Sequence, residues 1–203
     1  MASKYRLNVS ALYLPGTDIP KNRLNITDAE TIRAIEQELL EEGYRVFLDE
    51  LDEATRFDEQ YFKSLHKRTF ESLYEWAGIY RDFNMAKGDS RFCQGAFVES
   101  ESRRIFGELR RLDYLRGYED RSKEEFVRHL AYFQCELIAL HPFYELNGRI
   151  TRMFFDLIAA YNGYRFIDYG QVSPQAYIEA SIDCVQLADC RKMEEIIAKG
   201  LSK

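Results

Sequence analysis

The sequence predicts a mostly α-helical bundle that carries one β-hairpin flap. Apolar residues recur at helical spacing through most of the chain, whereas only residues 79–98 contain two stretches of extended-type composition around a glycine turn. The 203 residues contain no internal repeat, low-complexity tract or long linker. We therefore expect residues 1–203 to form a single domain around one core.

The first helix is expected after an irregular beginning. Residues 1–26 form the predicted irregular N-terminal segment, because two prolines and a glycine interrupt them. Thr27 is a suitable N-cap, and Glu30, three residues later, completes a capping box. The helix is expected over residues 28–42 and ends at Gly43.

Six further segments have helical periodicity, several of them bounded by a capping serine or a glycine. They are residues 57–76, 99–115, 123–140, 148–161, 174–187 and 189–199. The helix over 123–140 has the clearest start, since Ser122 and Glu125 have the spacing of a cap.

The predicted flap lies between the second and third helices. Its two stretches, IYRDFNMAK and RFCQGAFV, are separated by Gly88-Asp89-Ser90. Two short extended segments around such a turn predict a hairpin over residues 79–98. No other part of the sequence is a β candidate.

Charge and hydropathy narrow the class of protein. The chain has 28 Lys and Arg against 34 Asp and Glu, a formal charge of -6 and a pI near 5.3. We therefore expect it to bind neither nucleic acid nor an anionic membrane. No run approaches the roughly 18 apolar residues that span a bilayer, and MASKYRLNVSALYLPG lacks the apolar centre of a signal peptide. The resulting expectation is a cytoplasmic protein.

The four cysteines are Cys93, Cys135, Cys184 and Cys190. They form no CxxC pair, and the chain has only three histidines, so a zinc site is not expected. In a cytosolic protein, buried free thiols are favoured over disulfides.

A twelve-residue motif, HPFYELNGRITR at residues 141–152, holds most of the polar residues that can do chemistry. Pro142 pushes His141 into extended geometry and has no amide hydrogen to donate, so the preceding helix must end there. A new helix is expected from about Asn147, because apolar residues again follow at helical spacing. The unpaired amides at a helix start attract anions.

The residues around this helix start suit a polyphosphate. Leu146, Asn147 and Gly148 are expected to present consecutive amides as a concave nest, with the positive end of the helix dipole behind it. Arg149 and Arg152 are three residues apart, so both project from one side of the helix and can bind phosphate oxygens.

Two titratable side chains complete the motif. Glu145 precedes the nest, and a carboxylate beside phosphates is the usual protein ligand of Mg²⁺. His141 supplies a base that titrates near neutral pH. Each residue alone has a simpler structural role, such as an N-cap for Asn147 or an exposed ion pair between Arg152 and Asp156. Their combination within twelve residues favours a functional site.

The motif resembles the signature of the Fic family, in which His, Phe, an acidic residue, Gly, Asn, Gly and two Arg occur in fixed order. The matching residues here are His141, Phe143, Glu145, Asn147, Gly148, Arg149 and Arg152. Leu146 stands where the family usually has glycine. PKNRLNIT at 20–27, YEWAG at 74–78 and the predicted hairpin also resemble segments of Fic domains, so the resemblance covers most of the chain and implies a Fic-like helical bundle.

The resemblance implies transfer of AMP from ATP to a hydroxyl side chain of a target protein, with release of pyrophosphate. His141 would take the hydroxyl proton, Glu145 would hold Mg²⁺ on the α- and β-phosphates, and Phe143 would anchor the loop in the core. The residues implied to bind the nucleotide phosphates, by amides or side chains, are Leu146, Asn147, Gly148, Arg149 and Arg152.

Two protein partners are also implied. An extended segment of the target would pair with the edge of the hairpin and so bring its hydroxyl to His141. Many Fic proteins carry an inhibitory helix with Ser or Thr, three residues, Glu, then Gly or Asn. The nearest match here is Thr55 with Glu59, followed by Gln60. We therefore expect no built-in inhibitor, and a separate antitoxin-like partner or regulation by other means.

Leu146 leaves two alternatives open. Either its position is already helical, so that leucine is tolerated with its side chain turned away, or nucleotide binding is weakened or altered. The competing functions are a Doc-like kinase, which moves a different phosphate-containing group, and a non-catalytic nucleotide- or peptide-binding module. The intact Asn-Gly-Arg segment argues against the first, and the retained His141 argues against the second.

Overall fold

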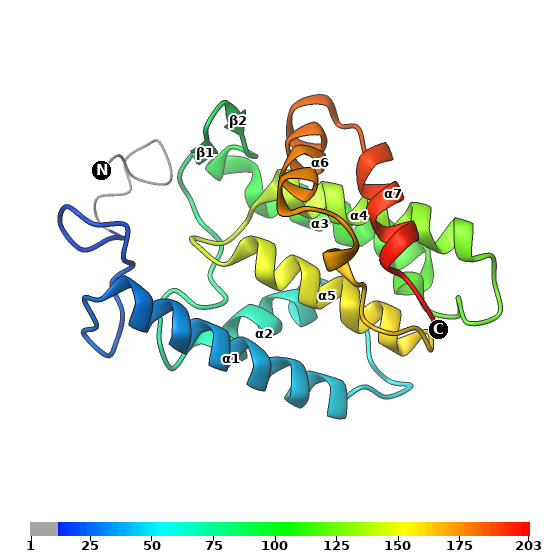
Figure 1. Cartoon of the computed structure of the whole chain (residues 1–203), viewed down its shortest axis with the longest axis horizontal. Coiled ribbons are helices and arrows are strands. Elements are labelled where there is room, and N and C mark those ends of the chain that lie inside the picture. The colour runs from blue at the N-terminus through cyan, green and yellow to red at the C-terminus, as the bar shows by residue number, and fades with distance from the viewer. Residues whose placement is uncertain (1–11) are drawn as a thin grey trace.

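Helix α5 (Asn147–Tyr161) runs through the centre of the molecule, and the other helices are arranged around it (Figure 1). A computed structural model describes residues 12–203. Helices α1 (Ala29–Asp49) and α2 (Glu59–Phe70) pack against α5 on one side, and α4 (Lys123–Leu140) packs against it on another. The apolar side chains of α5 that are wholly buried are Ile150, Met153, Phe154, Phe155, Leu157, Ile158 and Ala159. The predicted mostly helical class is confirmed.

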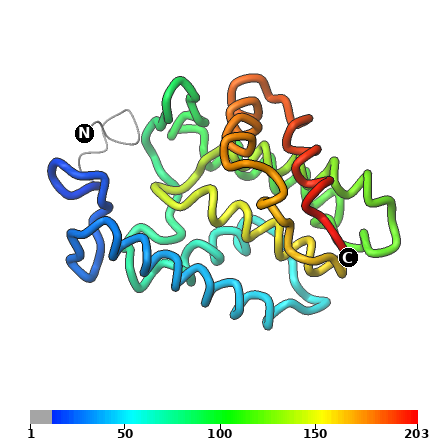
Figure 2. Tube along the Cα trace, in the orientation of Figure 1, coloured from blue at the N-terminus to red at the C-terminus, as the bar shows by residue number. Residues whose placement is uncertain are grey.

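The remaining helices cover α4. Helix α3 (Val98–Arg111) packs on one face, while α6 (Pro174–Leu187) and α7 (Arg191–Gly200) pack on another. Figure 2 shows how the chain passes from α5 through a long connection into this pair. Three short 3₁₀ turns are η1 (Gly95–Phe97), η2 (Asp113–Leu115) and η3 (Tyr169–Gln171). Ser122 caps α4 as predicted, since its hydroxyl accepts from the Glu125 amide at 3.3 Å.

The start and end of α1 differ from the prediction. Asp28, not Thr27, is the N-cap, because its carboxylate accepts from the Thr31 amide at 2.7 Å. The helix also continues through Gly43 to Asp49. A Cβ at Gly43 would lie 2.7 Å from the Thr69 hydroxyl, so this glycine permits close packing of α1 on α2 and does not end a helix.

Two other predicted helices were too long. Helix α2 ends at Phe70, and the chain then turns. After the turn, the Leu73 carbonyl accepts a hydrogen bond from the backbone amide of Arg23 in the N-terminal segment. The segment predicted as one helix over 99–115 is α3 followed by η2, whose three residues have positive φ. Tertiary contacts override helical periodicity at both places.

The flap over residues 79–98 contains much less strand than predicted. Only β1 (Ala86–Lys87) and β2 (Ser90–Arg91) pair, as an antiparallel two-residue ladder. The base of the flap binds the motif loop: Tyr80 forms an isolated bridge with Phe143, and the Arg81 amide donates to Pro142. Backbone groups used in this way are not available for a longer ladder.

The N-terminal segment is irregular where it is described. Residues 12–20 form a turn closed by an isolated bridge between Tyr13 and Pro20. The rest of the predicted irregular segment, residues 1–11, lies outside the described residues. Within residues 12–203, no helix combines the length and apolar character needed to cross a bilayer.

The prediction of free thiols was wrong for two cysteines. Cys135 on α4 and Cys184 on α6 form a disulfide, with Cα atoms 5.0 Å apart. Packing of α6 on α4 brings these residues, 49 positions apart, within the range that a disulfide needs. Cys93 and Cys190 are free and half-buried.

A buried arginine joins the flap to the end of α4. The Arg81 side chain, 2% exposed, donates to the carbonyl oxygens of Leu140, His141, Phe83 and Cys93. The first two carbonyls lie where α4 ends, and the other two lie on the two arms of the flap. One guanidinium therefore satisfies helix-terminal carbonyls and holds the flap in place.

Arg81→Ala should lower the free energy of unfolding by about 4 kcal/mol, because four buried carbonyl oxygens lose a charged donor. Urea unfolding would measure the change. Arg91→Ala, at an exposed position on β2, is the matched control and should change stability by less than about 0.5 kcal/mol. A loss below about 1 kcal/mol in Arg81→Ala would contradict this role.

Candidate functional site

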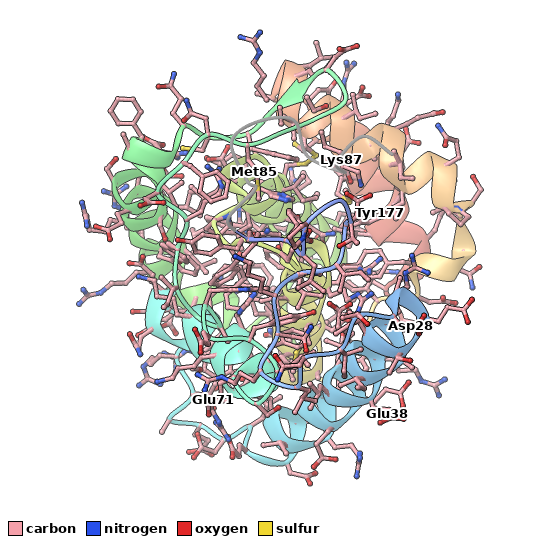
Figure 3. The ribbon with its side chains drawn as sticks, turned by 90° about the vertical axis from the view of Figure 1, so that its left-hand side faces the viewer. Asp28, Glu38, Glu71, Met85, Lys87 and Tyr177 are labelled. Atoms are coloured by element: carbon pink, nitrogen blue, oxygen red, sulfur yellow. A yellow bond between two sulfur atoms is a disulfide. The ribbon has the colours of Figure 1, made fainter. Side chains whose placement is uncertain are left out.

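The motif residues meet at the N-terminal end of α5. Figure 3 views the molecule from this end, and residues 12–28 cross in front of α5, between Met85 on the flap and Asp28 at the start of α1. The site therefore lies between the flap, the N-terminal segment and the start of α5. It is built from segments far apart in the sequence.

His141 ends α4 in a left-handed conformation. Its φ is 46° and its ψ is 59°, and its amide donates to the Leu137 carbonyl at 3.0 Å. The break expected from Pro142 is confirmed, but the extended geometry expected at His141 is wrong, because the helix ends in a left-handed residue. The imidazole stacks on Phe92 of the flap with ring centroids 3.8 Å apart, and Arg81 binds the His141 carbonyl at 2.7 Å. The flap therefore fixes both the backbone and the ring of this histidine.

Asn147 locks the loop between α4 and α5. Its Oδ1 accepts from the Phe143 amide at 2.7 Å, and its Nδ2 donates to the Phe143 carbonyl at 2.8 Å. Phe143 is wholly buried, as predicted for an anchor. The Asn147 side chain is thus occupied within the protein, which leaves its backbone amide as the group available to a ligand.

Three consecutive amides at the start of α5 are unpaired in the described part of the chain, and Gly148 among these residues is exposed. The amides of Arg149 and Ile150 both donate to the Leu146 carbonyl at 3.1 Å, whereas those of Leu146, Asn147 and Gly148 have no acceptor among residues 12–203. A Cβ added to Gly148 would meet nothing within 4 Å, and no positive φ requires glycine there. Unpaired amides at a helix start, beside a glycine with free space around it, suit an anion such as a phosphate.

Leu146 does not take the right-handed helical conformation that would tolerate it most easily. Its φ is 64° and its ψ is 10°, a left-handed geometry that costs a residue with a Cβ about 1–2 kcal/mol. The side chain is 8% exposed and packs in the core. Leucine therefore adopts the backbone geometry suited to glycine, while its side chain points away from solvent.

Glu145 contacts two other parts of the chain. Its carboxylate accepts a hydrogen bond from the Tyr13 hydroxyl in the N-terminal segment. Its carbonyl faces Nε2 of His66 at 3.1 Å, and His66 Nδ1 accepts from the Gly78 amide at 2.9 Å. Burial lowers the pKa of His66 to about 4, so this histidine is neutral at pH 7 and donates from Nε2.

The two arginines of the motif have different surroundings. Arg149 Nη1 lies 3.2 Å from Oε2 of Glu36 on α1. The Arg152 guanidinium lies 5.5 Å from the ring centre of Tyr177 and 5.9 Å from that of Tyr169.

The exposed Arg152–Asp156 ion pair considered above does not form within the described residues. Asp156 is 5% exposed and accepts from the Tyr44 hydroxyl at 2.6 Å and from the Ile167 amide at 3.0 Å. Burial raises the pKa of Asp156 to about 6, against the opposing effects of these hydrogen bonds and of Arg152.

Sequence reasoning missed several residues that shape the site. Arg81 holds His141, His66 holds the Glu145 backbone, and Tyr13 contacts the Glu145 carboxylate. His66 had the one usable signal, because it is a titratable residue on a mostly apolar face of α2. The others occur singly in segments without regular periodicity.

Comparison with known proteins identifies similar chains. A sequence model of the Fic/DOC family matches residues 56–159. "Probable protein adenylyltransferase y4lH" of Sinorhizobium fredii is 34% identical over 179 residues, covering 88% of this chain and 90% of that protein. "Probable protein adenylyltransferase Fic" of Escherichia coli is 28% identical over 203 residues, covering 100% and 98%.

A solved structure has the same fold. The crystal structure of BepC protein from Bartonella tribocorum with bound AMPPNP aligns with a TM-score of 0.80 at 22% identity. The alignment covers 95% of this chain and 96% of that one.

The left-handed geometry of Leu146 predicts an unusual order of stability. Leu146→Ala and Leu146→Gly remove the same buried side chain, but only glycine adopts a φ of 64° without strain. The glycine variant should therefore be more stable than the alanine variant by about 1 kcal/mol. Chemical unfolding of both variants would measure this. The usual helical order, with alanine the more stable, would show that this position is not left-handed in solution.

Proposed function

Because the chain belongs to the Fic/DOC family, we propose that it is a protein adenylyltransferase that moves AMP from ATP to a hydroxyl side chain of a target protein. The observation that carries the proposal is the start of α5, where three unpaired amides and two arginines lie in one motif with His141. Binding of a polyphosphate alone needs no base, whereas transfer to a hydroxyl does.

The proposed reaction needs one proton transfer and one exchange of bonds at phosphorus. The target oxygen attacks the α-phosphorus, the bond to the oxygen that bridges the α- and β-phosphates breaks, and pyrophosphate leaves. His141 takes the proton of the attacking hydroxyl. The stack on Phe92 holds the imidazole in one orientation, and Arg81 holds the backbone carbonyl of the same residue, which favours a positioned base.

The start of α5 would bind the phosphates. The amides of Leu146, Asn147 and Gly148 and the side chains of Arg149 and Arg152 supply donors to the developing negative charge. The helix dipole acts in the same direction. The relative from Bartonella tribocorum was crystallised with the ATP analogue AMPPNP, which supports a nucleotide as the ligand of this fold.

The donor set fits a magnesium ion held jointly with the nucleotide. Mg²⁺ beside phosphates needs only one or two protein carboxylates. Glu145 supplies one at the edge of the nest, and no group of three or more potential ligands occurs within the described residues. Bound there, the ion would neutralise phosphate charge, and the Tyr13 hydroxyl would share or release the Glu145 carboxylate.

Labelled ATP tests this function directly. With ATP labelled on the α-phosphate, cell lysate and Mg²⁺, the wild-type chain should label target protein, and His141→Ala should lower the rate at least about 100-fold, because it lacks the base. Label transferred from the γ-phosphate would instead indicate a Doc-like kinase. ATP binding without transfer of either label would leave the non-catalytic module as the function.

We further propose that targets pair with the edge of β1 that faces away from β2. The Ser90 side chain on β2 accepts from Gln186 on α6, so that edge of the hairpin is covered. The Phe92 amide donates to the Met85 carbonyl, and because antiparallel ladder bonds alternate, the Ala86 amide faces away from β2. An extended segment of a target can bind there by main-chain hydrogen bonds.

Ala86→Pro tests this surface, because proline removes the outward amide without removing a ladder bond. Transfer of α-label to target protein should fall at least about tenfold, while binding of AMPPNP stays unchanged. Lys87→Ala, at the exposed neighbouring position, is the control. Unaltered transfer in Ala86→Pro would exclude strand pairing along β1.

Regulation by a separate antitoxin-like protein is part of the proposal. Glu59, the nearest match to the inhibitory pattern, accepts from the Ser102 hydroxyl at 2.8 Å and pairs with Lys63 at 3.4 Å. Both contacts lie at the start of α2 and involve neither arginine of the motif. The α-label assay on the chain purified alone bears on this point, since a built-in inhibitor would keep the rate low.

A further inference from the structure

Glu36 lies behind the first arginine of the motif, on the face of α1 that packs against α5. It is 6% exposed, and its two carboxylate oxygens have different partners. Oε1 accepts from the Tyr74 hydroxyl at 2.6 Å, and Oε2 lies 3.2 Å from Arg149 Nη1. The Tyr74 ring is stacked on Trp76 with centroids 4.3 Å apart, so the carboxylate is held from behind.

The arginine is more exposed than the carboxylate. The Arg149 side chain is 29% exposed, whereas that of Glu36 is 9% exposed, so solvent reaches the arginine side chain but hardly reaches the carboxylate. Nη1 is buried and, although it lies within ion-pair distance of Glu36, makes no hydrogen bond with proper geometry among residues 12–203. A guanidinium has five N–H groups, so one contact with Glu36 leaves donors for another anion.

Packing of α1 does not require this ion pair. Ile32 and Phe47, 3% and 2% exposed, already bury the same helix in the core. A buried ion pair contributes little to stability relative to apolar side chains of similar size. The ion pair instead orders the Arg149 side chain. A long side chain that is already ordered loses less entropy when it binds a phosphate.

We propose that Glu36 is a positioning residue that orients Arg149 for the β- and γ-phosphates of ATP and so sets the preference of the site for the triphosphate. The proposal rests on the proposed function, because it takes the start of α5 as the phosphate site. Glu36 lies on α1, outside residues 56–159 that match the family model. The phosphate site therefore extends to a helix that the motif does not include.

Calorimetric binding of two probes, AMPPNP and AMP, tests the proposal with Mg²⁺ present. Glu36→Gln keeps the shape of the side chain and the contact with Tyr74 but removes the charge. It should weaken binding of AMPPNP about tenfold and leave binding of AMP, which lacks the two outer phosphates, within about twofold. Glu38→Gln, exposed on the same helix, is the matched control and should behave as wild type.

A double-mutant cycle tests whether Glu36 affects AMPPNP binding through Arg149. In an Arg149→Ala background, Glu36→Gln should weaken AMPPNP binding less than about twofold, because the residue that it positions is gone. Tyr74→Phe removes the donor to Glu36 and should weaken AMPPNP binding about threefold, again with AMP unchanged. This variant also serves if thermal unfolding shows that Glu36→Gln does not fold.

Three results would overturn the proposal. Glu36→Gln could weaken binding of AMPPNP and AMP equally, which would indicate a structural role, or it could leave AMPPNP binding unchanged or tighter. In the Arg149→Ala background, Glu36→Gln could still weaken AMPPNP binding about tenfold. Failure of the proposed function is distinguishable from these. A wild-type chain that binds neither probe overturns both proposals, whereas one that binds AMPPNP with the expected Glu36 dependence but transfers no α-label overturns only the transferase.

Discussion

The contacts of Arg81 constrain the rest of the site. A proline at position 142 forces α4 to end abruptly, which leaves carbonyl oxygens of its last turn without amide partners. Arg81 satisfies the carbonyls of Leu140 and His141 from within the core and at the same time binds both arms of the flap. The end of the helix, the histidine and the flap therefore form one unit.

The start of α5 shows the complementary arrangement. The loop before it uses the Asn147 side chain and His66 to satisfy its own polar groups, while three amides of the helix start remain unpaired. Leu146 accepts a strained left-handed geometry there, and the burial of its side chain offsets that strain. The polar groups of the loop are thus satisfied within the protein, and the three unpaired amides are available to a ligand.

The sequence predicted much of this arrangement for identifiable reasons. The break at Pro142, the new helix at Asn147, the Ser122 cap and the short hairpin each depend on local stereochemistry, and all are present. The predictions that were wrong concern features that depend on tertiary packing. Gly43 inside α1, the early end of α2 and the short strands of the flap depend on which distant segment lies alongside, as does the disulfide between Cys135 and Cys184.

The sequence by itself determined the helical class, the position of the motif and its set of chemical groups, because helix spacing, proline geometry and residue type are local properties of the chain. Only the tertiary structure decided which residues hold those groups in place. Arg81, His66, Glu36 and Tyr13 lie 60, 79, 113 and 132 positions from the groups that they contact. No local pattern encodes such contacts, since they arise when packing of the apolar faces brings separate helices and loops together.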